Sequence, residues 1–273
     1  MVTTYDLVSG QLKHLSDAAS MNAASAQLPQ GAYTTFRTYA GDRVLRLEQH
    51  LRRLEESVNL LQTGDTLVDD DVRRALGTAL RLTGYAESRF RLTFSPPHFF
   101  ISIESFKAYP AALYEQGVRC MTVTTHRHNP HAKSTAFIAS AGDAYKALPS
   151  GVHEGLMVDD DGTLLEGLSS NFFALLGSTL HTEQGRALVG VTQSLALEVA
   201  QTVLPDLMLS SSGVAYADLP QVRECFITSV SREIVPVVRI DDQTIGAGVP
   251  GTVTRRLMAG MRELIVQEAR SVL

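Results

Sequence analysis

The 273-residue chain has only two cysteines, and it lacks a long apolar run. Cys120 and Cys225 lie far apart in apolar, strand-like segments, where a reduced core cysteine is commoner than a disulfide or a metal ligand. No run approaches the roughly 18 apolar residues that span a bilayer, and no charged-then-apolar leader opens the chain. We therefore expect a cytoplasmic protein without a membrane-spanning segment, in a reducing compartment.

Blocks of like charge are also missing, and the formal net charge is only −5. Because there is no basic patch, we expect no binding to nucleic acid. Three histidines occur at positions 126, 128 and 131, but they have no acidic partner and no helical spacing that would hold two imidazoles on one face. We expect no metal site there, and a small polar metabolite as the partner.

What the chain does contain is a succession of helix and strand patterns, which predicts a mixed α/β fold. Its length suits two medium-sized domains. The periodicity breaks in FKAYPAALYEQG, where a proline interrupts the pattern. We predict an N-terminal α/β domain at residues 1–106, an interdomain linker at 107–116 and a C-terminal domain at 117–273.

The clearest predicted helix begins near residue 45, where leucines and a valine recur at spacings of three and four. Gly64 is predicted to end this helix. Strands are predicted on both sides of turns at residues 40–42, at the Pro-Pro pair and at residues 160–162. Further helices are predicted at residues 70–82, at 136–148, after Thr192 and from Gly251 onward.

A lone lysine stands in the small-residue run HAKSTAFIASAGDA, and the chain has only four lysines. Because the neighbours of Lys133 have little bulk, an apolar setting would lower the pKa of its ammonium group and give a nucleophilic amine. Such an amine forms a Schiff base with a carbonyl compound. The alternative is a surface lysine in a loop, and Lys133 needs partners before it indicates a site.

Several arginines are candidates for binding anions. Arg53 follows His50 by three residues at the border of the apolar helix face, so both side chains can point inward, with an exposed helix arginine as the alternative. Arg37 and Arg91 lie on predicted strands, where each is a candidate for gripping a carboxylate or for a structural ion pair. The helix after LVGVTQ offers backbone amides to a phosphate, although Thr192 also suits an ordinary cap.

Several separated motifs follow one another along nearly the whole chain: GAYTTFR, HLRRL with Ser57, Lys133, GLMVDDDGTLLEGLSSNFF, LVGVTQ and FITSVSREIVPV with IGAGVPG. In this order they resemble the fold-type IV, or class IV, pyridoxal-phosphate enzymes. That family includes branched-chain aminotransferases, D-amino-acid aminotransferases and aminodeoxychorismate lyases. The resemblance implies two α/β domains with pyridoxal 5′-phosphate in the cleft between them, and a homodimer whose partner chain completes each pocket.

The resemblance assigns roles to individual residues. Lys133 matches the lysine that holds the cofactor as an internal aldimine and then moves the proton between substrate and cofactor carbons. Glu166 matches the carboxylate that faces the pyridine nitrogen and keeps it protonated, with a surface hairpin glutamate as the alternative. Arg53 matches the phosphate-binding arginine, and Val191 and Thr192 match the turn whose amides meet the same phosphate.

The sequence departs from the family pattern at several positions. The tyrosine that often follows the lysine by five residues, and that contacts the cofactor hydroxyl in the family, is replaced here by Ile138. The Gly-Thr pair on the phosphate side is Ser229 and Val230, so we expect the hydroxyl from Ser229 or Ser231. Gln193 replaces the last residue of the GITR-like motif.

The resemblance also frames the reaction. The expected activity is transfer of an amino group from an amino acid to a 2-oxo acid, in the manner of a branched-chain aminotransferase, and Tyr33 matches a position that lines the substrate pocket. A lyase of the aminodeoxychorismate type is the alternative, although the glycine-rich arginine loop of those lyases is missing. The Arg-x-His pair of the D-amino-acid enzymes and the glycine-asparagine-tyrosine run of branched-chain members are missing too. A non-catalytic protein that binds the cofactor is a lesser alternative.

Overall fold

The computed structural model describes residues 1–61 and 69–273, so the helix end predicted at Gly64 lies outside the described residues. The described residues fold into two compact units. The first contains Met1–Ala108, His131–Ala139 and Ile265–Leu273, and the second contains Tyr109–Pro130 and Ser140–Leu264. The linker predicted at 107–116 stays a prediction.

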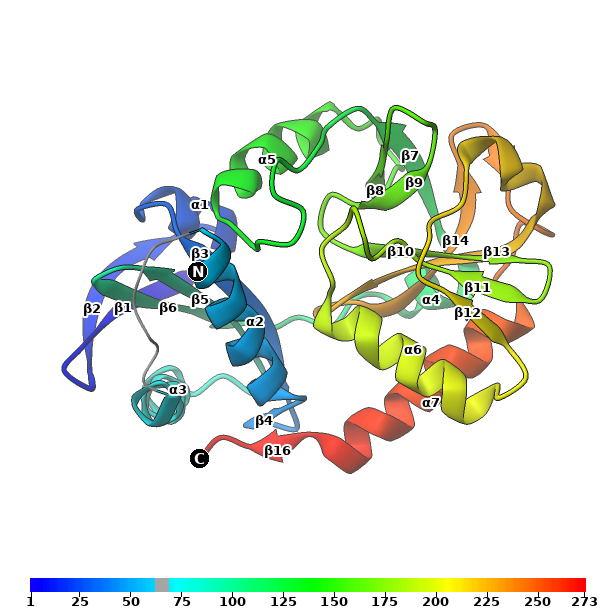
Figure 1. Ribbon diagram of the computed structural model, residues 1–273. Helices are drawn as coiled ribbons and strands as arrows, with labels where there is room; N and C mark the ends of the chain where they lie inside the picture. The colour runs from blue at the N-terminus through cyan, green and yellow to red at the C-terminus, as the bar shows by residue number, and fades with distance from the viewer. Residues whose placement is uncertain (62–68) are drawn as a thin grey trace. The chain divides into compact units, whose positions relative to one another are not determined.

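The first unit is built on an antiparallel sheet in which β3 and β5 pair side by side (Figure 1). The turns predicted from Ala-Gly-Asp and Pro-Pro are confirmed, because β3 pairs with β4 and β5 pairs with β6. The strand order is β16-β4-β3-β5-β6-β1-β2. The strands are β1 (Val2–Val8), β2 (Gln11–Ala18), β3 (Ala32–Tyr39), β4 (Arg43–Val44), β5 (Ser88–Ser95), β6 (His98–Ser105) and β16 (Arg270–Ser271).

Helix α2 (Leu47–Leu60) packs against β3 through the apolar face that its sequence predicts. Leu47, Leu51 and Leu54 on that face are buried, and removing such side chains from water is the main driving force for this packing. Phe36 of β3 contacts the ring of His50 at 5.5 Å between centroids. The other helices that lie wholly in the first unit are α1 (Met21–Ala26) and α3 (Asp69–Thr83).

The second unit has a mixed sheet in which β9 pairs with both β8 and β10. This extra pairing closes β7, β8, β9, β10, β13 and β14 into a ring of strands. The strand order is β12-β11-β10-β13-β14-β7-β8-β9, and β15 pairs with β14. The strands are β7 (Val118–Val123), β8 (Glu154–Val158), β9 (Leu164–Gly167), β10 (Asn171–Leu176), β11 (Thr179–His181), β12 (Met208–Ser210), β13 (Val222–Ser229), β14 (Glu233–Ile240) and β15 (Gln243–Thr244).

Helix α6 (Val191–Val203) lies against β13 on one face of this sheet (Figure 1). Helix α7 (Thr252–Glu268) approaches α6 closely at Gly260. A Cβ at Gly260 would lie only 2.7 Å from a Val199 methyl carbon of α6. Helices α5 (Ala136–Ala147) and α7 (Thr252–Glu268) confirm the helices predicted at 136–148 and from Gly251 onward. The remaining helices are α4 (Ala111–Gln116) and the 3-10 helix η1 (Tyr216–Gln221).

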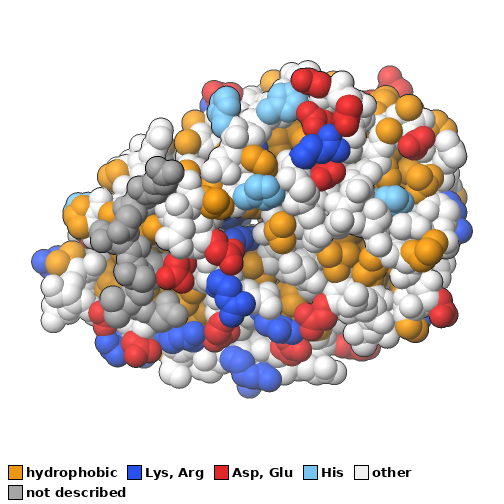
Figure 2. Space-filling view, viewed as in Figure 1, with side chains coloured by type: hydrophobic (Ala, Val, Ile, Leu, Met, Phe, Trp, Pro, Cys, Tyr) orange, Lys and Arg blue, Asp and Glu red, His pale blue; other side chains and the backbone are white. Residues whose placement is uncertain are grey.

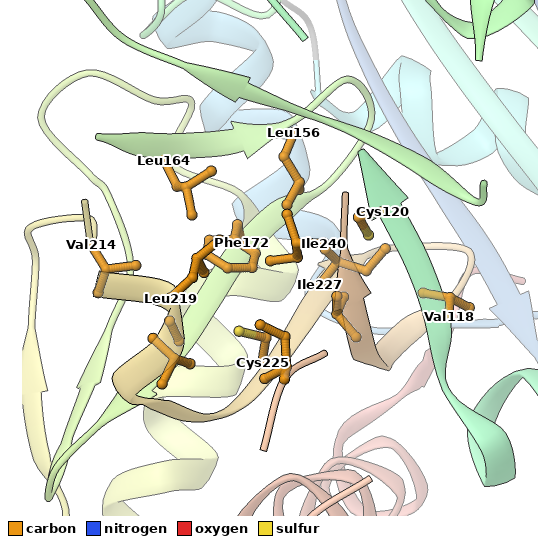
Figure 3. Close-up of a cluster of buried hydrophobic side chains, with 14 of the residues drawn as sticks. Val118, Cys120, Leu156, Leu164, Phe172, Val214, Leu219, Cys225, Ile227 and Ile240 are labelled. Carbon is orange, nitrogen blue, oxygen red and sulfur yellow. The ribbon is translucent and has the colours of Figure 1, made fainter. Parts of the chain in front are cut away.

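The core of the second unit contains both cysteines (Figure 3). Cys120 and Cys225 are buried and free, which confirms the prediction of reduced core cysteines. Burial raises the pKa of each thiol, so neither one is a reactive thiolate. Among the described residues, no helix has the length and apolar character needed to cross a membrane.

Candidate active site

Main-chain hydrogen bonds attach the Lys133 segment to two elements of the first unit. The Tyr33 amide donates to the Lys133 carbonyl oxygen at 2.8 Å. The Lys133 amide donates to Oγ of Ser57 at 3.0 Å, and that hydroxyl donates to the Arg53 carbonyl oxygen at 2.8 Å. Lys133 is therefore held between the start of β3 and helix α2, because Ser57 connects its amide to the turn of α2 that carries Arg53.

Gly31 and Thr135, which lie two residues from Tyr33 and Lys133 respectively, fix the same segment. The Thr135 amide donates to the Gly31 carbonyl oxygen, and the Gly31 amide donates to Oγ1 of Thr135, each at 2.9 Å. A Cβ at Gly31 would lie 2.1 Å from the carbonyl oxygen of Phe94, so a larger residue would force the backbone apart. This close approach requires glycine, and it places Lys133 beside the central strands.

The side chain of Lys133 lies over an aromatic ring. Its Nζ is 4.7 Å from the centroid of Tyr33, and the guanidinium of Arg91 is 5.1 Å from the same centroid. The structure thus brings together Lys133 and two residues predicted to bind substrate. A ring face attracts both cations, so Tyr33 restrains the direction of the lysine side chain.

Arg53 and His50 form a buried polar pair on the inner face of α2. Nη2 of Arg53 donates to Oγ1 of Thr34 at 3.0 Å, and Nδ1 of His50 is 3.2 Å from the same oxygen. The pKa of His50 is lowered well below its usual value by burial first, then by the positive charges of Arg53 and Lys133. His50 is therefore neutral near pH 7.

Arg37 and Arg91 have structural contacts in the first unit. Arg91 Nη1 donates to Oγ of Ser25 at 2.7 Å and to the Met21 carbonyl oxygen at 3.1 Å, which ties α1 to the sheet. Arg37 lies 4.1 Å from the ring centroid of Tyr39. Its Nη1 is also 4.0 Å from a carboxylate oxygen of Glu87. A role for either arginine in binding a substrate carboxylate stays a prediction.

Glu166 is the penultimate residue of β9 in the second unit, and its side chain is buried against an arginine. Nε of Arg127 lies 3.1 Å from Oε1 of Glu166, and the Leu188 amide donates to the same oxygen at 3.3 Å. The Arg127 side chain is 7% exposed and that of Glu166 is 4% exposed. Two donors on one buried oxygen stabilise the ionised carboxylate.

A cavity of about 330 Å³ adjoins this pair. Arg186 lines this cavity, and Nη1 of Arg186 pairs with Asp159 at 2.7 Å and with Asp161 at 2.9 Å. Hydrogen bonds from Thr163 and Arg186 lower the pKa of Asp161 to about 2. The residues that line the cavity are His126, Arg127, Pro130, Met157, Asp159, Asp160, Leu165, Glu166, Gly185 and Arg186.

Acidic and basic side chains are interspersed on the face of the molecule that Figure 2 shows, without separation into patches of one sign. The described residues contain no group of three or more His, Cys, Asp or Glu side chains that could hold a metal ion.

The N-terminus of α6 is fixed by its own glutamine. Oε1 of Gln193 accepts a hydrogen bond from the Gly190 amide at 3.1 Å, and Nε2 of Gln193 donates to Oγ1 of Thr182 at 2.8 Å. Val191 and Thr192 form the first turn of the helix, where backbone amides have no intrahelical acceptor. Gln193 thus acts as an internal brace, a role that its match to the family motif did not predict.

Glycine is required at residue 190 for a close approach. A Cβ there would lie 2.1 Å from Oδ1 of Asn171, and Nδ2 of Asn171 donates to the Leu188 carbonyl oxygen at 2.6 Å. Asn171 of β10 also pairs with Glu166 of β9. One asparagine therefore connects the strand of the carboxylate to the start of α6.

Ser229 is the last residue of β13, and Val230 follows it in the turn to β14; both are partly exposed. Oγ of Ser229 accepts a hydrogen bond from Nε of Arg232 at 3.0 Å. Ile138 is half-buried in α5, and its amide donates to the Thr135 carbonyl oxygen at 3.0 Å, one turn beyond Lys133. Its side chain has no hydroxyl, so it supplies no hydrogen bond in place of the tyrosine.

Sequence reasoning missed Arg127, Thr34 and Arg232 because each one acquires its role from a distant partner. Arg127 is 39 residues from Glu166, and Arg232 is 78 residues from Glu154. A single sequence carries no signal for such pairs. Ser57 was different, because its position after HLRRL marked it as part of the resemblance.

Comparison with known proteins agrees with the fold. Residues 31–240 match the family described as amino-transferase class IV. A D-alanine aminotransferase of Bacillus licheniformis is 26% identical over 283 residues, which cover 96% of this chain and 97% of the relative. A branched-chain-amino-acid aminotransferase of Pseudomonas aeruginosa is 26% identical over 262 residues, which cover 86% of this chain and 84% of that relative.

Among solved structures, a branched-chain amino acid aminotransferase of T.th. with pyridoxamine 5′-phosphate superposes with a TM-score of 0.82. It is 18% identical, and the match covers 99% of this chain and 98% of that one. The predicted two-domain fold of type IV is thereby confirmed. Because the family match covers most of the chain, the protein belongs to the class IV aminotransferases, which are pyridoxal-phosphate-dependent enzymes.

Proposed function

We propose that this enzyme transfers the amino group of a branched-chain or similar apolar amino acid to a 2-oxo acid, with Lys133 as the reacting amine. The observation that carries the proposal is the fixation of Lys133, whose amide and carbonyl bond to Ser57 and Tyr33 and whose Nζ lies 4.7 Å from the Tyr33 ring. A restrained amine beside a conformationally fixed backbone suits repeated bond formation at one carbon.

The donor set fits pyridoxal 5′-phosphate. An amine, a buried guanidinium, the amides at the start of a helix and a buried carboxylate are the groups that an aldehyde, a phosphate and a protonated pyridine require. We propose that Lys133, Arg53, Glu166, Val191 and Thr192 each bind one part of this cofactor. Ser229 and Val230 are proposed to contact its phosphate.

Each proposed residue has a separate task. Lys133 would hold the aldehyde end of the cofactor, and its Nζ would carry the proton between the substrate α-carbon and the cofactor carbon. Arg53 holds the phosphate with its guanidinium, which Thr34 orients. Glu166 stays ionised beside Arg127 and holds the proton of the pyridine nitrogen. The cofactor, when bound, supplies an electron sink for the carbon that loses its proton.

The substrate assignment rests on the relatives, which include branched-chain and D-alanine aminotransferases. Tyr33 is proposed to line the substrate pocket because it lies beside Lys133 Nζ. Arg37 and Arg91 remain candidates for the substrate carboxylate. The homodimer implied by the family resemblance is proposed as well, and light scattering on the purified protein measures it.

The test is the visible absorption of the purified protein with pyridoxal 5′-phosphate, for wild type, Lys133→Ala and Lys146→Ala. Lys146 is the matched control because it is an exposed lysine paired with Asp143. Wild type and Lys146→Ala are expected to show a visible band that L-leucine, L-valine or L-isoleucine abolishes, while Lys133→Ala shows none. A band that persists in Lys133→Ala rejects the role of this lysine, and a band discharged only by D-alanine rejects the substrate class.

A further inference from the structure

A buried ion pair lies beneath the turn between β13 and β14. Nη2 of Arg232 donates to Oε2 of Glu154 at 2.9 Å. The Arg232 side chain is 9% exposed, and that of Glu154 is fully buried. Burial, the largest single effect, opposes the charged form of Arg232, but the charge of Glu154, its hydrogen bond to Arg232 and the nearby tyrosines together outweigh burial and raise the pKa of the guanidinium. The Arg232 guanidinium is therefore held in its charged form beside this carboxylate.

The carboxylate of Glu154 is saturated with further donors. Its Oε2 accepts hydrogen bonds from Oγ of Ser169 at 3.0 Å and from Oγ of Ser170 at 2.9 Å. Its Oε1 accepts one from the hydroxyl of Tyr145. Burial and the charge of Glu154 raise the pKa of Tyr145, so this hydroxyl stays a donor. Glu154 thus cannot move without breaking contacts to several elements.

The same guanidinium reaches the turn itself. Nε of Arg232 donates to Oγ of Ser229 at 3.0 Å, and the Arg232 amide donates to the Ser229 carbonyl oxygen at 3.2 Å. A guanidinium has only donors, so the Ser229 oxygen must use a lone pair in this bond. The hydroxyl proton of Ser229 is then directed away from Arg232, and it is free to bond to another acceptor.

We propose that Arg232, held by Glu154, is a positioning residue that turns the Ser229 hydroxyl into a hydrogen-bond donor for the cofactor phosphate. Ser229 is partly exposed, as such a donor must be, and its neighbour Val230 has no hydroxyl to offer. Between the two serines of this turn, the structure selects Ser229, because within the described part of the chain the Ser231 side chain receives no such bond. This inference rests on the proposed function, since it specifies the cofactor contact of that site.

The experiment compares two ligands that differ only in the phosphate. Dissociation constants of pyridoxal 5′-phosphate and of pyridoxal are measured by absorbance titration of the apoprotein for wild type, Ser229→Ala and Arg232→Lys. Lysine keeps a positive charge near Glu154 but has no Nε–H that reaches Ser229 at the same time. Both variants are expected to weaken binding of the phosphorylated ligand about tenfold, as loss of one bond to a charged group implies, with pyridoxal unchanged.

The double variant and two single controls separate this role from simple destabilisation. Because Arg232 acts through Ser229, the variant Ser229→Ala/Arg232→Lys is expected to lose no more than either single variant. Ser178→Ala, an exposed turn serine of the same unit, is expected to match wild type. Equal losses for both ligands, additive losses, or a loss in Ser231→Ala but not in Ser229→Ala would each overturn the inference.

The wild-type titration keeps this test apart from the proposed function. If wild type binds neither ligand, the proposed function itself fails. If wild type prefers the phosphorylated ligand and both variants keep that preference, only the role of Arg232 and Ser229 fails.

Discussion

Nε of Arg127 lies 3.1 Å from Oε1 of Glu166, and both side chains are almost fully buried. A buried carboxylate beside a guanidinium stays ionised, because losing the charge would leave the arginine without its counterion. In the proposed function this arrangement keeps Glu166 able to hold a proton on the cofactor ring. The ion pair of Arg127 and Glu166 is therefore expected to contribute both to the stability of the second unit and to cofactor binding.

Arg127→Met is expected to destabilise the protein by about 3 kcal/mol, since breaking a buried pair leaves the other charge uncompensated. Glu166→Gln in the same background removes that charge, so the double variant is expected to regain part of the loss. Chemical denaturation of the four proteins measures both effects. Additive losses in the double variant would show that the two side chains are not energetically coupled.

Glu166→Gln alone is expected to lower kcat at least about a hundredfold, because an amide holds the ring proton far less well than a carboxylate. Glu183→Gln is the matched control. Glu183 is a buried glutamate of the same unit whose carboxylate accepts hydrogen bonds from the amides of Gly185, Arg186 and Gly213. The Glu183→Gln variant is expected to have a lower melting temperature than wild type and an unchanged kcat. Equal kcat in the two variants would remove Glu166 from the proposed chemistry.

Arg53→Ala is expected to weaken pyridoxal 5′-phosphate binding by about ten- to a hundredfold, because a charged hydrogen-bond donor to the phosphate is lost. Arg52→Ala provides the comparison, since Arg52 is an exposed neighbour on the same helix. Titration of both apoproteins gives the dissociation constants. If the affinity of Arg53→Ala for pyridoxal 5′-phosphate equals that of wild type, residues other than Arg53 bind the phosphate.

His50 predicts how stability depends on pH. Its pKa in the folded protein is below the unfolded value of about 6.5, so the unfolded chain binds the extra proton first. The free energy of unfolding should be highest above pH 6.5 and should fall, by at most about 1.4 kcal/mol per pH unit from this group, as the pH drops toward the folded pKa.

His50→Gln is expected to reduce that slope between pH 7.5 and 5.5 in denaturation experiments, because glutamine does not titrate. His153, whose pKa is also lowered, keeps part of the slope in this variant. Asn59→Gln, a change at an exposed, non-titrating position of the same helix, is expected to leave the slope as in wild type. The same slope in all three proteins would contradict a neutral, buried His50.

Glu224 stabilises the start of α7. Its carboxylate accepts hydrogen bonds from the Thr254 amide at 2.7 Å and from the Val253 amide at 3.1 Å. Glu224→Ala is expected to cost about 1–2 kcal/mol, as loss of a helix cap and of a negative charge at the positive helix end implies. Glu263→Ala, a change at an exposed position of the same helix, is expected to lower the free energy of unfolding by less than half of that amount. Thermal denaturation of both variants measures the difference.

The sequence alone determined the local structure. The leucines of α2 recur at helical spacing and are buried, and alternating residues of β3 and β5 form the strands that were predicted, because one face of each element must leave water. Lys133 and Glu166 were identified because their flanking motifs are contiguous in the chain. The strand β2, the helix α1 and the short helix α4 were not predicted, because their exposed positions carry little apolar periodicity.

Only the tertiary structure decided which groups surround the candidate residues. The bond between the Lys133 amide and Ser57 spans 76 residues of sequence, and the pair of Arg232 and Glu154 spans 78. Both depend on which strands pair and in which register, and that choice is made by the burial of the whole sheet. Local patterns therefore specify where a reactive side chain stands in the chain, while its orientation and charge state follow from partners that the fold brings to it.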